Sequence, residues 1–516
     1  MKEKNVAIID MGSNSVRLVI YYINDRGAVY KLDDLKNSIR LSSHFDVDGS
    51  INEIGRKLTI QSLKQFKQLC DSREVTSIRG VATAALRQAK NQKEILQEIH
   101  KETGITFEIL SGQEEARYGY LAVRSSMDID EAIIVDIGGG STEISYMKSR
   151  KLINSISLPY GAVNMTEKYF KGFDVVSRQD VAPLLLEVFS QLERIPWLKN
   201  LKCPVIGLGG TARSLASIHQ AKRRYSFNSI HNYKMDAYDI ELIFHYLRRT
   251  PLQARKNIEG LSSGREDIIV AGVSIYKAIM EYVDIEEFYV STQGIRDGIC
   301  HEIVMKEADV SLDEDIVSMH MKRFAHYYKI NVDHAEHVMQ ISVMLFRQLA
   351  EKGAIKYSEK EARLLAIAAY LHDIGRSINV YHTHNHTFYL LSNVNLPGLT
   401  HKERLLVALV ASFKKPHILR ERIQQFNDIV NEDDEFMIRQ LGFILLIARA
   451  LDRTASKQVE EIQVLQEETG LVIVCHVNRK RIIETDLAAE LVKKSKKFFG
   501  MEISLRPIKK LKKLLR

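Results

Sequence analysis

The sequence predicts an α/β protein with two related lobes, followed by an all-helical domain and a small α/β piece. Three observations lead to this prediction. An apolar strand that ends in aspartate and enters a glycine-rich turn occurs twice, near residues 6–20 and 134–144. Strands alternate with helices up to about residue 308, which is typical of α/β lobes. From Ile316 to Arg453 the apolar residues follow a helical period with almost no strand signal.

The stretch from Ile134 to Ile144 reads as a β-hairpin with a glycine tip. Asp136 and Glu143 stand at the two ends of the turn, where they can hold a divalent cation. Backbone N–H groups of such a tip form an anion site, because glycine has no Cβ in the way. The tip residues expected to bind phosphate are Gly138, Gly139, Gly140, Ser141 and Thr142. The alternative is a tight hairpin with no ligand.

A second hairpin and a third turn repeat this pattern. The strand Val6–Asp10 enters a turn, and Val205–Ala212 reads as a strand that enters a glycine turn and then a helix. Two similar hairpins in one chain indicate two related lobes that face one phosphate chain. The pattern resembles the actin-like and sugar-kinase ATPase superfamily. The phosphate-binding candidates in these turns are Gly12, Ser13, Asn14, Gly209, Gly210 and Thr211.

Composition places the chain among ordinary soluble proteins. Of its 516 residues 45% are hydrophobic and 27% are charged, and no apolar run approaches the ~20 residues of a membrane span. The first apolar run contains Asp10, so we expect no signal peptide. The four cysteines are scattered without a CxxC pair, so we expect neither structural zinc nor a disulfide framework. A cytoplasmic protein without membrane partners is expected.

The net charge is +8 and the pI is about 9.0, and basic residues crowd the C-terminal end. A solvated helix face is one interpretation of this run. The other is a track for a polyanion. Aromatic residues are sparse here, which favours a polyanion without bases over specific nucleic acid. The track candidates are Lys493, Lys494, Lys496 and Lys497.

The elements expected in lobe I, residues 1–125, are a three-stranded meander followed by alternating helices and strands. Apolar spacing supports each helix, and alternation supports each strand. These strands are Val6–Asp10, Val16–Ile23, Ala28–Ser42, Thr76–Ala82 and Ile105–Leu110, and the helices are Ile51–Gln68, Ala84–Ala89, Lys93–His100 and one that follows Ser111.

The elements expected after lobe I fall into three parts: lobe II at 126–308, a helical domain at 309–463 and a basic α/β subdomain at 464–516. Lobe II contains the hairpin, a strand at Leu152–Leu158, the third turn and the helices around a strand at Glu287–Ser291. Its expected helices are Val163–Phe170, Arg178–Ile195, Thr211–Gln220, Asp236–Arg249, Arg265–Tyr282 and Gly294–Lys306. The subdomain is expected to contain Gly470–Asn478, Leu487–Phe499 and Met501–Leu505 as strand, helix and strand.

Glu114 has two competing interpretations. Ser111 is a good N-cap and Glu114 occupies the capping-box position three residues later. Alternatively, Glu114 and Glu115 follow a strand that ends at the edge of the glycine tips, where a carboxylate could orient or deprotonate water. Position alone does not decide between them.

Taken together, these motifs resemble the exopolyphosphatase and guanosine pentaphosphate phosphohydrolase family. The resemblance covers the first 305 residues, and the helical region is similar to the domain of the long, exopolyphosphatase-type members. It rests on five segments, namely Asp10–Ser15, Ala84–Ala89, Ser111–Arg117, Asp136–Glu143 and Gly207–Thr211.

The resemblance implies a phosphoric anhydride hydrolase that removes terminal phosphates from inorganic polyphosphate with Mg²⁺, with K⁺ as a further candidate ion. It implies that Glu114 activates water, that Asp136 and Glu143 serve the metal, with Asp10 as a third candidate, and that Arg87 lies near the phosphates. It also implies a homodimer. The third turn departs slightly from the pattern, because Gly209 stands where relatives often have serine.

The helical region contains histidines that resemble part of an HD-type metal phosphohydrolase. Arg449 stands where such enzymes have a late aspartate, with Asp452 one turn later, and Phe413 stands where relatives often have histidine. An arginine beside Asp373 would compete with a cation, so a structural cluster is predicted rather than a working metal centre. The residues that carry the resemblance are His334, His372, Asp373, His382, His384 and His386.

Other functions remain open at this stage. The nearest rival is a phosphohydrolase acting mainly on guanosine pentaphosphate, which shares the terminal phosphoanhydride. A sugar or carboxylate kinase of the same superfamily and an actin-like ATP-binding scaffold are the rivals from other classes. A scaffold would need no catalytic glutamate.

Overall fold

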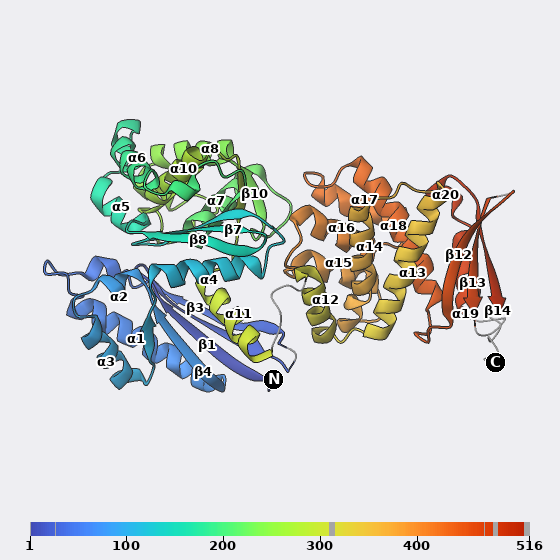
Figure 1. Cartoon of the computed structure of the whole chain (residues 1–516), viewed down its shortest axis with the longest axis horizontal. Coiled ribbons are helices and arrows are strands. Elements are labelled where there is room, and N and C mark those ends of the chain that lie inside the picture. Colours follow the sequence, from blue (N-terminus) through green and yellow to red (C-terminus); the bar gives the residue numbers. More distant parts are fainter. Residues whose placement is uncertain (1, 26, 309–314, 469, 478–482, 510–516) are drawn as a thin grey trace. The chain divides into compact units, whose positions relative to one another are not determined.

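The computed structural model describes residues 2–25, 27–308, 315–468, 470–477 and 483–509 (Figure 1). The chain forms two compact units. The first comprises Met1–Tyr225 and Ser229–Ile316, and the second comprises Ser226–Asn228 and Val317–Arg516. No helix of the described residues combines the length and hydropathy that crossing a membrane requires. The four cysteines are buried and free.

The first unit contains two sheets, and the sheet of lobe I has five strands in the order β3-β2-β1-β4-β5. β1, β2 and β3 form the predicted antiparallel meander, and β4 and β5 join it in parallel with β1. The strand predicted at Ala28–Ser42 ends early, because Arg40 adopts a left-handed φ of 49° before a short 3₁₀ turn at Leu41–His44. The strands are β1 (Lys4–Met11), β2 (Val16–Ile23), β3 (Val29–Asn37), β4 (Val75–Ala82) and β5 (Phe107–Ile109).

The sheet of lobe II repeats this topology with one additional edge strand. Its order is β10-β11-β9-β6-β7-β8, so β6, β7, β8, β9 and β11 correspond to the five strands of lobe I in turn. The repeated order confirms the prediction of two related α/β lobes. The strands are β6 (Ala132–Ile137), β7 (Thr142–Lys148), β8 (Lys151–Leu158), β9 (Val205–Leu208), β10 (Tyr233–Asp236) and β11 (Glu287–Val290).

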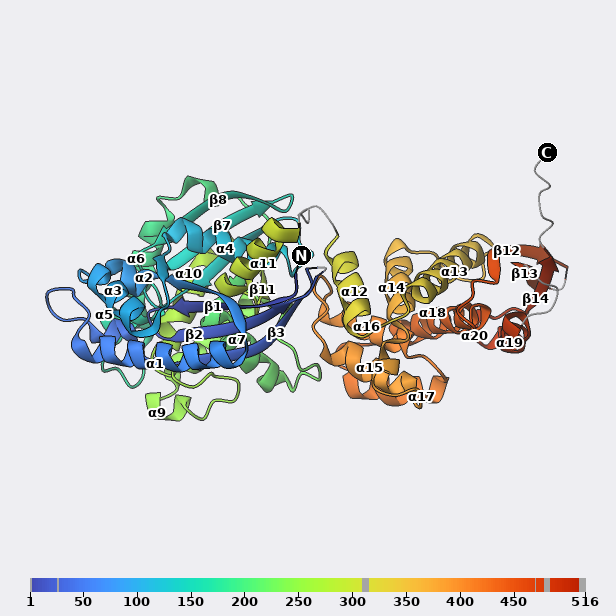
Figure 2. The ribbon, with the colours of Figure 1, turned by 90° about the horizontal axis from the view of Figure 1, so that it is seen from below.

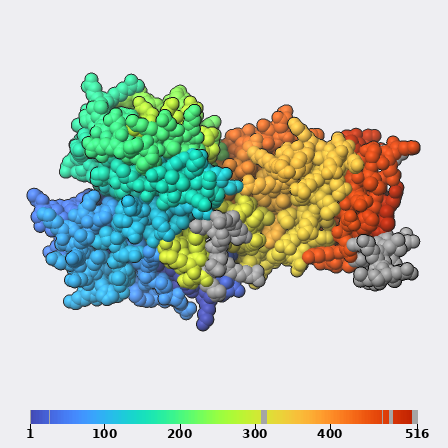
Figure 3. Space-filling model, viewed as in Figure 1, coloured from blue at the N-terminus to red at the C-terminus, as the bar shows by residue number. Residues whose placement is uncertain are grey.

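Helices cover the sheets, and two of them pack between the lobes. α4 contacts α11 as well as β7 and β8, and one apolar cluster contains side chains of both sheets, including Ile8, Ile134 and Ile206. The two lobes therefore share part of one core, and their atoms meet along a continuous boundary in Figure 3. The helices are α1 (Glu53–Ser72), α2 (Ala84–Gln88), α3 (Gln92–Thr103), α4 (Gly112–Arg124), α5 (Ala162–Tyr169), α6 (Arg178–Leu192), α7 (Gly209–Arg223), α8 (Ala237–Arg249), α9 (Leu252–Arg255), α10 (Ile269–Val283) and α11 (Ile295–Ala308), with a 3₁₀ turn η2 (Pro196–Leu198).

The second unit begins with the predicted helical domain. Two helices of 20 residues, α13 and α18, pack together at its centre, and the side chains of Asn331 and Asn431 cap their first turns. The elements are α12 (Ile316–Tyr327), α13 (Val332–Glu351), α14 (Glu359–Leu371), η3 (Ile374–Ser377), α15 (Thr383–Asn393), α16 (His401–Ala411), α17 (Pro416–Ile423), η4 (Gln424–Phe426) and α18 (Glu432–Leu451).

The chain ends in a three-stranded sheet rather than in the two strands that the sequence predicts. The order is β12-β13-β14, and β12 begins at Val459, inside the region predicted as helical. The rings of Phe443 and Phe498 stack with centroids 4.0 Å apart, which joins α18 to this end piece (Figure 2). The elements are β12 (Val459–Glu467), β13 (Gly470–Val477), α19 (Ile483–Val492), α20 (Lys496–Phe499) and β14 (Ile503–Lys509).

Candidate active site

The turns of the two hairpins are closed by the same hydrogen bond. In the β1–β2 turn the N–H of Gly12 donates to the carbonyl of Ser15 at 3.0 Å. In the β6–β7 turn the N–H of Gly138 donates to the carbonyl of Ser141 at 2.9 Å. The two predicted hairpins are thus alike in their hydrogen bonding as well as in sequence.

The two tips face each other across the junction of the lobes. A Cβ added at Gly139 would lie 2.8 Å from the Cβ of Ser13, closer than two carbon atoms can pack. Any other residue at position 139 would push the two tips apart, so this close approach requires glycine. This arrangement directs backbone groups from both lobes at one space.

The third turn closes the same space from the end of β9. Gly209 has a φ of +77°, and a Cβ there would lie 2.6 Å from Oδ1 of Asp136. Only glycine meets both conditions without strain. The turn starts the 15-residue helix α7, whose first N–H groups lack partners within the helix and favour a negatively charged ligand.

These turns enclose a pocket of about 170 Å³. Its lining comes from both hairpin tips, the third turn, α4 and the segment that leads into α11, and it includes no aromatic side chain among the described residues. Of the predicted residues, those that line it are Asp10, Gly12, Ser13, Asn14, Asp136, Gly138, Gly139, Gly140, Ser141, Glu143, Gly209 and Gly210.

Four carboxylates line this pocket, and burial raises the pKa of each. The pKa of Asp136 rises to about 6. The pKa of Glu143 rises to about 7, through burial first and the negative charge of Asp136 second. Burial also raises the pKa of Asp10 and holds that of Glu115 well above its usual range. Each carboxylate would be stabilised in its charged form by a cation in the pocket.

Three arginines that the sequence analysis did not identify also line the pocket: Arg213, Arg265 and Arg296. Nη1 of Arg296 lies 2.7 Å from Oδ2 of Asp10. Burial, followed by the positive charges of neighbouring arginines, lowers the pKa of Arg213 to about 10. The positive charges of Arg296 and Arg265 help to lower the pKa of Arg213, so these guanidinium groups repel one another. A bound phosphate would relieve the repulsion. They come from three separate elements, so no local motif in the sequence identifies them.

The structure corrects the assignment of Glu114. Its carboxylate accepts hydrogen bonds from the N–H of Ser111 at 2.7 Å and from the Ser111 hydroxyl at 2.8 Å, which completes the capping box of α4. It does not line the pocket, whereas the next residue, Glu115, does. Successive residues of a helix point about 100° apart, so the residue that caps α4 cannot also face the phosphate turns.

Three other predicted phosphate ligands lie behind the pocket rather than in its lining. Arg87 forms an ion pair with Glu115, so it holds the carboxylate in place. Thr142 is fully buried and its hydroxyl donates to the carbonyl of Tyr160 at 2.7 Å. Thr211 is also fully buried, and its hydroxyl accepts from Arg265 at 3.4 Å. These contacts fix the shape of the turns, and direct contact of the three residues with phosphate stays a prediction.

The predicted metal residues all line the pocket, but they do not form a closed metal cage. Asp136 and Glu143 are opposite each other in the register of β6 and β7. The Ser157 hydroxyl donates to Glu143 at 2.8 Å. Within the part of the chain that the structure describes, three such ligand atoms lie within 4.8 Å of one another only in the helical domain. Mg²⁺ usually takes one or two carboxylates and completes its shell with water and substrate phosphates, so Mg²⁺ beside Asp136 and Glu143 stays a prediction.

The lysines of the predicted track lie around α19 and α20. Lys493 pairs with Glu490, and Lys496 lies 3.6 Å from Glu502. Lys494 lines a hollow of about 590 Å³. Two of these lysines are therefore paired with carboxylates, while binding of a polyanion here stays a prediction.

Comparisons with known proteins identify the family of the chain. The model of the Ppx/GppA phosphatase family matches residues 19–307, and that of Ppx/GppA phosphatase, domain III, matches residues 317–491. A protein of Pseudoalteromonas atlantica named guanosine-5'-triphosphate,3'-diphosphate pyrophosphatase is 27% identical over 410 residues, 78% of each chain.

Solved structures resemble the first unit. The crystal structure of the Aquifex aeolicus member of the Ppx/GppA family is 33% identical, covers 59% of this chain and 99% of its own, and gives a TM-score of 0.52. An exopolyphosphatase from Cytophaga hutchinsonii is 22% identical, covers 60% of this chain and 100% of its own, and gives a TM-score of 0.55. The second similarity concerns the fold alone.

Proposed function

The chain belongs to the Ppx/GppA phosphatase family, and on that premise we propose that it is an exopolyphosphatase that releases terminal phosphates from inorganic polyphosphate. Membership makes it a phosphoric anhydride hydrolase. The choice of polyphosphate as substrate is the proposal.

The chemical groups that line the pocket support this proposal. Glycine turns and three arginines suit phosphate oxygens, and no aromatic side chain of the described residues lines the pocket to stack on a base. Its volume of about 170 Å³ is small for a nucleotide. An inorganic chain needs only phosphate contacts at its end, which is what this lining offers.

In the proposed reaction Glu115 accepts a proton from the attacking water. Its carboxylate is 5% exposed and faces the pocket, where Arg87 pairs with it and favours the charged form. The turn N–H groups and the three arginines stabilise the charge on the phosphoryl oxygens, which is the main task of the protein in phosphoryl transfer. Mg²⁺ bound to Asp136 and Glu143 would add positive charge beside the same oxygens.

A second candidate substrate is guanosine pentaphosphate. The observation in its favour is the name of the 27% identical relative, which covers 78% of this chain. The terminal phosphoanhydride is common to both substrates, so the same Glu115 and turns would act on either. The two candidates differ in whether a guanosine group adds to binding.

The test is phosphate release from long-chain polyphosphate, guanosine pentaphosphate and ATP, measured in parallel with the full chain and Mg²⁺. The proposal expects the largest kcat/KM on polyphosphate, and the Glu115→Gln variant, prepared identically, controls for contaminating phosphatases. A larger kcat/KM on guanosine pentaphosphate would overturn the choice of substrate and keep the catalytic residues. The homodimer implied by the family resemblance is tested by sedimentation velocity of the same preparation.

A further inference from the structure

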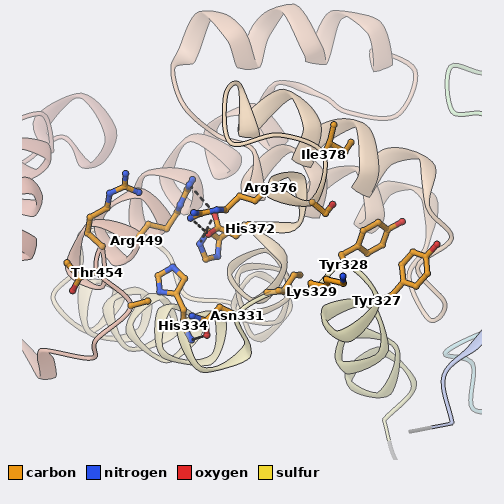
Figure 4. Close-up of a pocket in the computed structure, with 15 residues that line it drawn as sticks. Tyr327, Tyr328, Lys329, Asn331, His334, His372, Arg376, Ile378, Arg449 and Thr454 are labelled. Atoms are coloured by element: carbon orange, nitrogen blue, oxygen red, sulfur yellow. Dashed lines mark hydrogen bonds and ion pairs between the residues drawn. The ribbon is translucent and has the colours of Figure 1, made fainter. Parts of the chain in front are cut away.

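The helical domain contains a cavity of about 960 Å³, far larger than the pocket between the lobes. Figure 4 shows it with the lining side chains of α13, α18, η3 and the end of α12. Tyr327 and Tyr328 lie at the opposite end from Arg449. Ligand sites of small molecules commonly have volumes of ~300–1,000 Å³, so the cavity has room for a ligand of nucleotide size.

The charges around this cavity are mostly positive. Four cationic side chains line it, Lys329, Arg376, Arg449 and Arg453, against one carboxylate, Asp373. Among the described residues, neither Lys329 nor Arg453 forms an ion pair through its side chain. The cavity therefore has an excess of about three positive charges that the protein itself does not neutralise.

Arg449 is the most enclosed of these cations. Its Nη2 lies 3.6 Å from Oδ1 of Asp373, and Arg376 approaches the other oxygen of the same carboxylate at 3.2 Å. Burial lowers the pKa of Arg449, and the positive charges of Arg453 and Arg376 lower it further. One carboxylate shared by two guanidinium groups leaves donors free for a second anion, and such an anion would reduce the repulsion among the arginines.

The same cavity contains the histidines that resemble a metal centre, and their partners argue against a metal ion. Ligand atoms of His334, His372 and Asp373 lie within 4.8 Å of one another. Nδ1 of His334, however, lies 2.7 Å from Oδ2 of Asp452. Asp373 is paired with Arg449 and Arg376, so a cation would have to displace two arginines. The sequence prediction that an arginine pairs with this aspartate is confirmed.

We propose that this cavity is a second phosphoanion site, in which Arg376, Arg449 and Arg453 bind the diphosphate group of a small molecule without a metal ion. The Arg449 guanidinium provides, beside Asp373 and His372, the positive charge that a metal would otherwise provide. The end of the cavity near Tyr327 and Tyr328 accommodates the rest of the ligand. This site is separate from the catalytic pocket and does not depend on the substrate proposed above.

The first test is isothermal titration calorimetry of the full chain with inorganic pyrophosphate in EDTA, which prevents metal-dependent binding and turnover. Loss of one charge-assisted contact should weaken one binding event roughly 10- to 100-fold in Arg449→Gln and in Arg453→Gln. Binding at the catalytic pocket is the same in all variants and cancels in the comparison. Arg453 is exposed, so its variant serves even if the Arg449 variant fails to fold.

Arg439→Gln is the matched control, because Arg439 lies on the same helix α18 with a side chain 26% exposed, against 28% for Arg449, and does not line the cavity. It should bind pyrophosphate as the wild type does. Identical isotherms for the wild type and both cavity variants would overturn the proposal.

The Asp373→Asn variant separates an anion site from a metal site by the sign of its effect. Removing this carboxylate frees both guanidinium groups, so pyrophosphate should bind several-fold more tightly and give a larger increase in Tm than in the wild type. If His334, His372 and Asp373 instead form a metal site, the wild type would bind Mn²⁺ in the helical domain and Asp373→Asn would abolish that binding without strengthening pyrophosphate binding. That second result would overturn the proposal.

Discussion

The two glycine hairpins have the same turn but different charges at its ends. In lobe I, Asp10 stands opposite Arg17 in the strand register and forms an ion pair with Arg296. In lobe II, Asp136 stands opposite Glu143, so two carboxylates meet where lobe I has a carboxylate and a cation. The first hairpin is neutralised by the protein itself. The second lacks such a partner across its strands.

This difference indicates which of the two hairpins favours a bound cation. Burial raises the pKa of Asp10 as well, but Arg296 acts against this. The charge of Asp136 instead raises the pKa of Glu143 further, so an added cation favours the lobe II pair. We therefore expect Mg²⁺ on the lobe II side, beside Glu143 and close to Glu115, whose pKa the charge of Glu143 helps to raise.

Glu115→Gln should lower kcat by roughly 10²–10⁴, the usual contribution of a general base. The amide cannot accept the proton of water but keeps the shape of the side chain. Steady-state kinetics with saturating Mg²⁺ measure this loss, and circular dichroism checks the fold. A variant that keeps near-normal turnover would show that Glu115 is not the base.

Arg296→Gln should leave the Asp10 carboxylate of lobe I without its ion-pair partner, as the carboxylates of the lobe II hairpin have none across their strands. Asp10 would lose its partner in a buried environment, which costs about 3–5 kcal/mol when one member of a buried pair is removed. Urea unfolding measures the loss of stability. If added Mg²⁺ restores more stability to this variant than to the wild type, Asp10 has become a cation site, whereas an equal response in both proteins would contradict the explanation.

Asp136→Asn should raise the Mg²⁺ concentration needed for half-maximal activity by roughly 10-fold or more, because one of two candidate ligands loses its charge. The neutral side chain removes the repulsion with Glu143, so the fold should remain stable in EDTA. Activity measured over a Mg²⁺ titration gives the shift. An unchanged titration would mean that this carboxylate only shapes the hairpin.

The pH dependence of stability in EDTA should report the same pair of carboxylates. In the folded protein the pKa values are about 6 for Asp136 and about 7 for Glu143, above their ordinary 3.8 and 4.5. The folded state therefore binds protons more tightly, and the stability that this provides, of the order of 3 kcal/mol for each group, is present below about pH 4 and is lost as pH rises through 6 to 7. Mg²⁺, which prefers the charged form, should raise Tm more at pH 8 than at pH 5.5.

A control is needed because His372 acts in the opposite direction. Burial lowers its pKa to about 4, so its contribution to stability grows as pH rises from about 4 to 6.5. The informative quantity is the difference in stability between the wild type and Asp136→Asn at each pH, since the helical domain is the same in both. A difference that does not change between pH 5 and 8 would rule out titration of this pair.

Glu114→Gln should have the smallest effect. Glutamine can still occupy the capping box of α4, so stability falls by only about 0.3–1 kcal/mol through loss of the negative charge at the helix N-terminus. Turnover should stay within a few-fold of the wild type, because the side chain does not line the pocket. Thermal unfolding and kcat measured on one preparation distinguish the two contributions. A loss of kcat as large as that of Glu115→Gln would return the catalytic role to Glu114.

Much of the fold could be predicted because its signals are local. The strand, aspartate and glycine sequence identifies each hairpin within a few residues, and helical spacing identifies α1, expected at Ile51–Gln68 and found at Glu53–Ser72. The strand β12 was missed because its exposed, charged residues carry little apolar alternation, with only Val459, Ile462 and Val464 buried. A strand defined mainly by its pairing with β13 cannot be identified from its own sequence.

The site was predicted less completely, for two physical reasons. Arg213, Arg265 and Arg296 meet only through the topology of lobe II, so nothing in their local sequence indicates a shared pocket. Glu114 and Glu115 are neighbours in sequence but point in different directions from α4. The capping box beginning at Ser111 was the signal that could have separated them, because a glutamate that caps its own helix leaves the next one free to face the turns.

The matched strand order of the two sheets also has an evolutionary meaning. An ancestral half-protein with one such hairpin, paired with a copy of itself, would have offered identical tips to both sides of a phosphate group. Fusion of two copies into one gene would have freed the position opposite each aspartate to diverge, toward Arg17 in one half and Glu143 in the other. The different charges of the two hairpins would then have arisen by divergence at one pair of equivalent positions, Arg17 and Glu143.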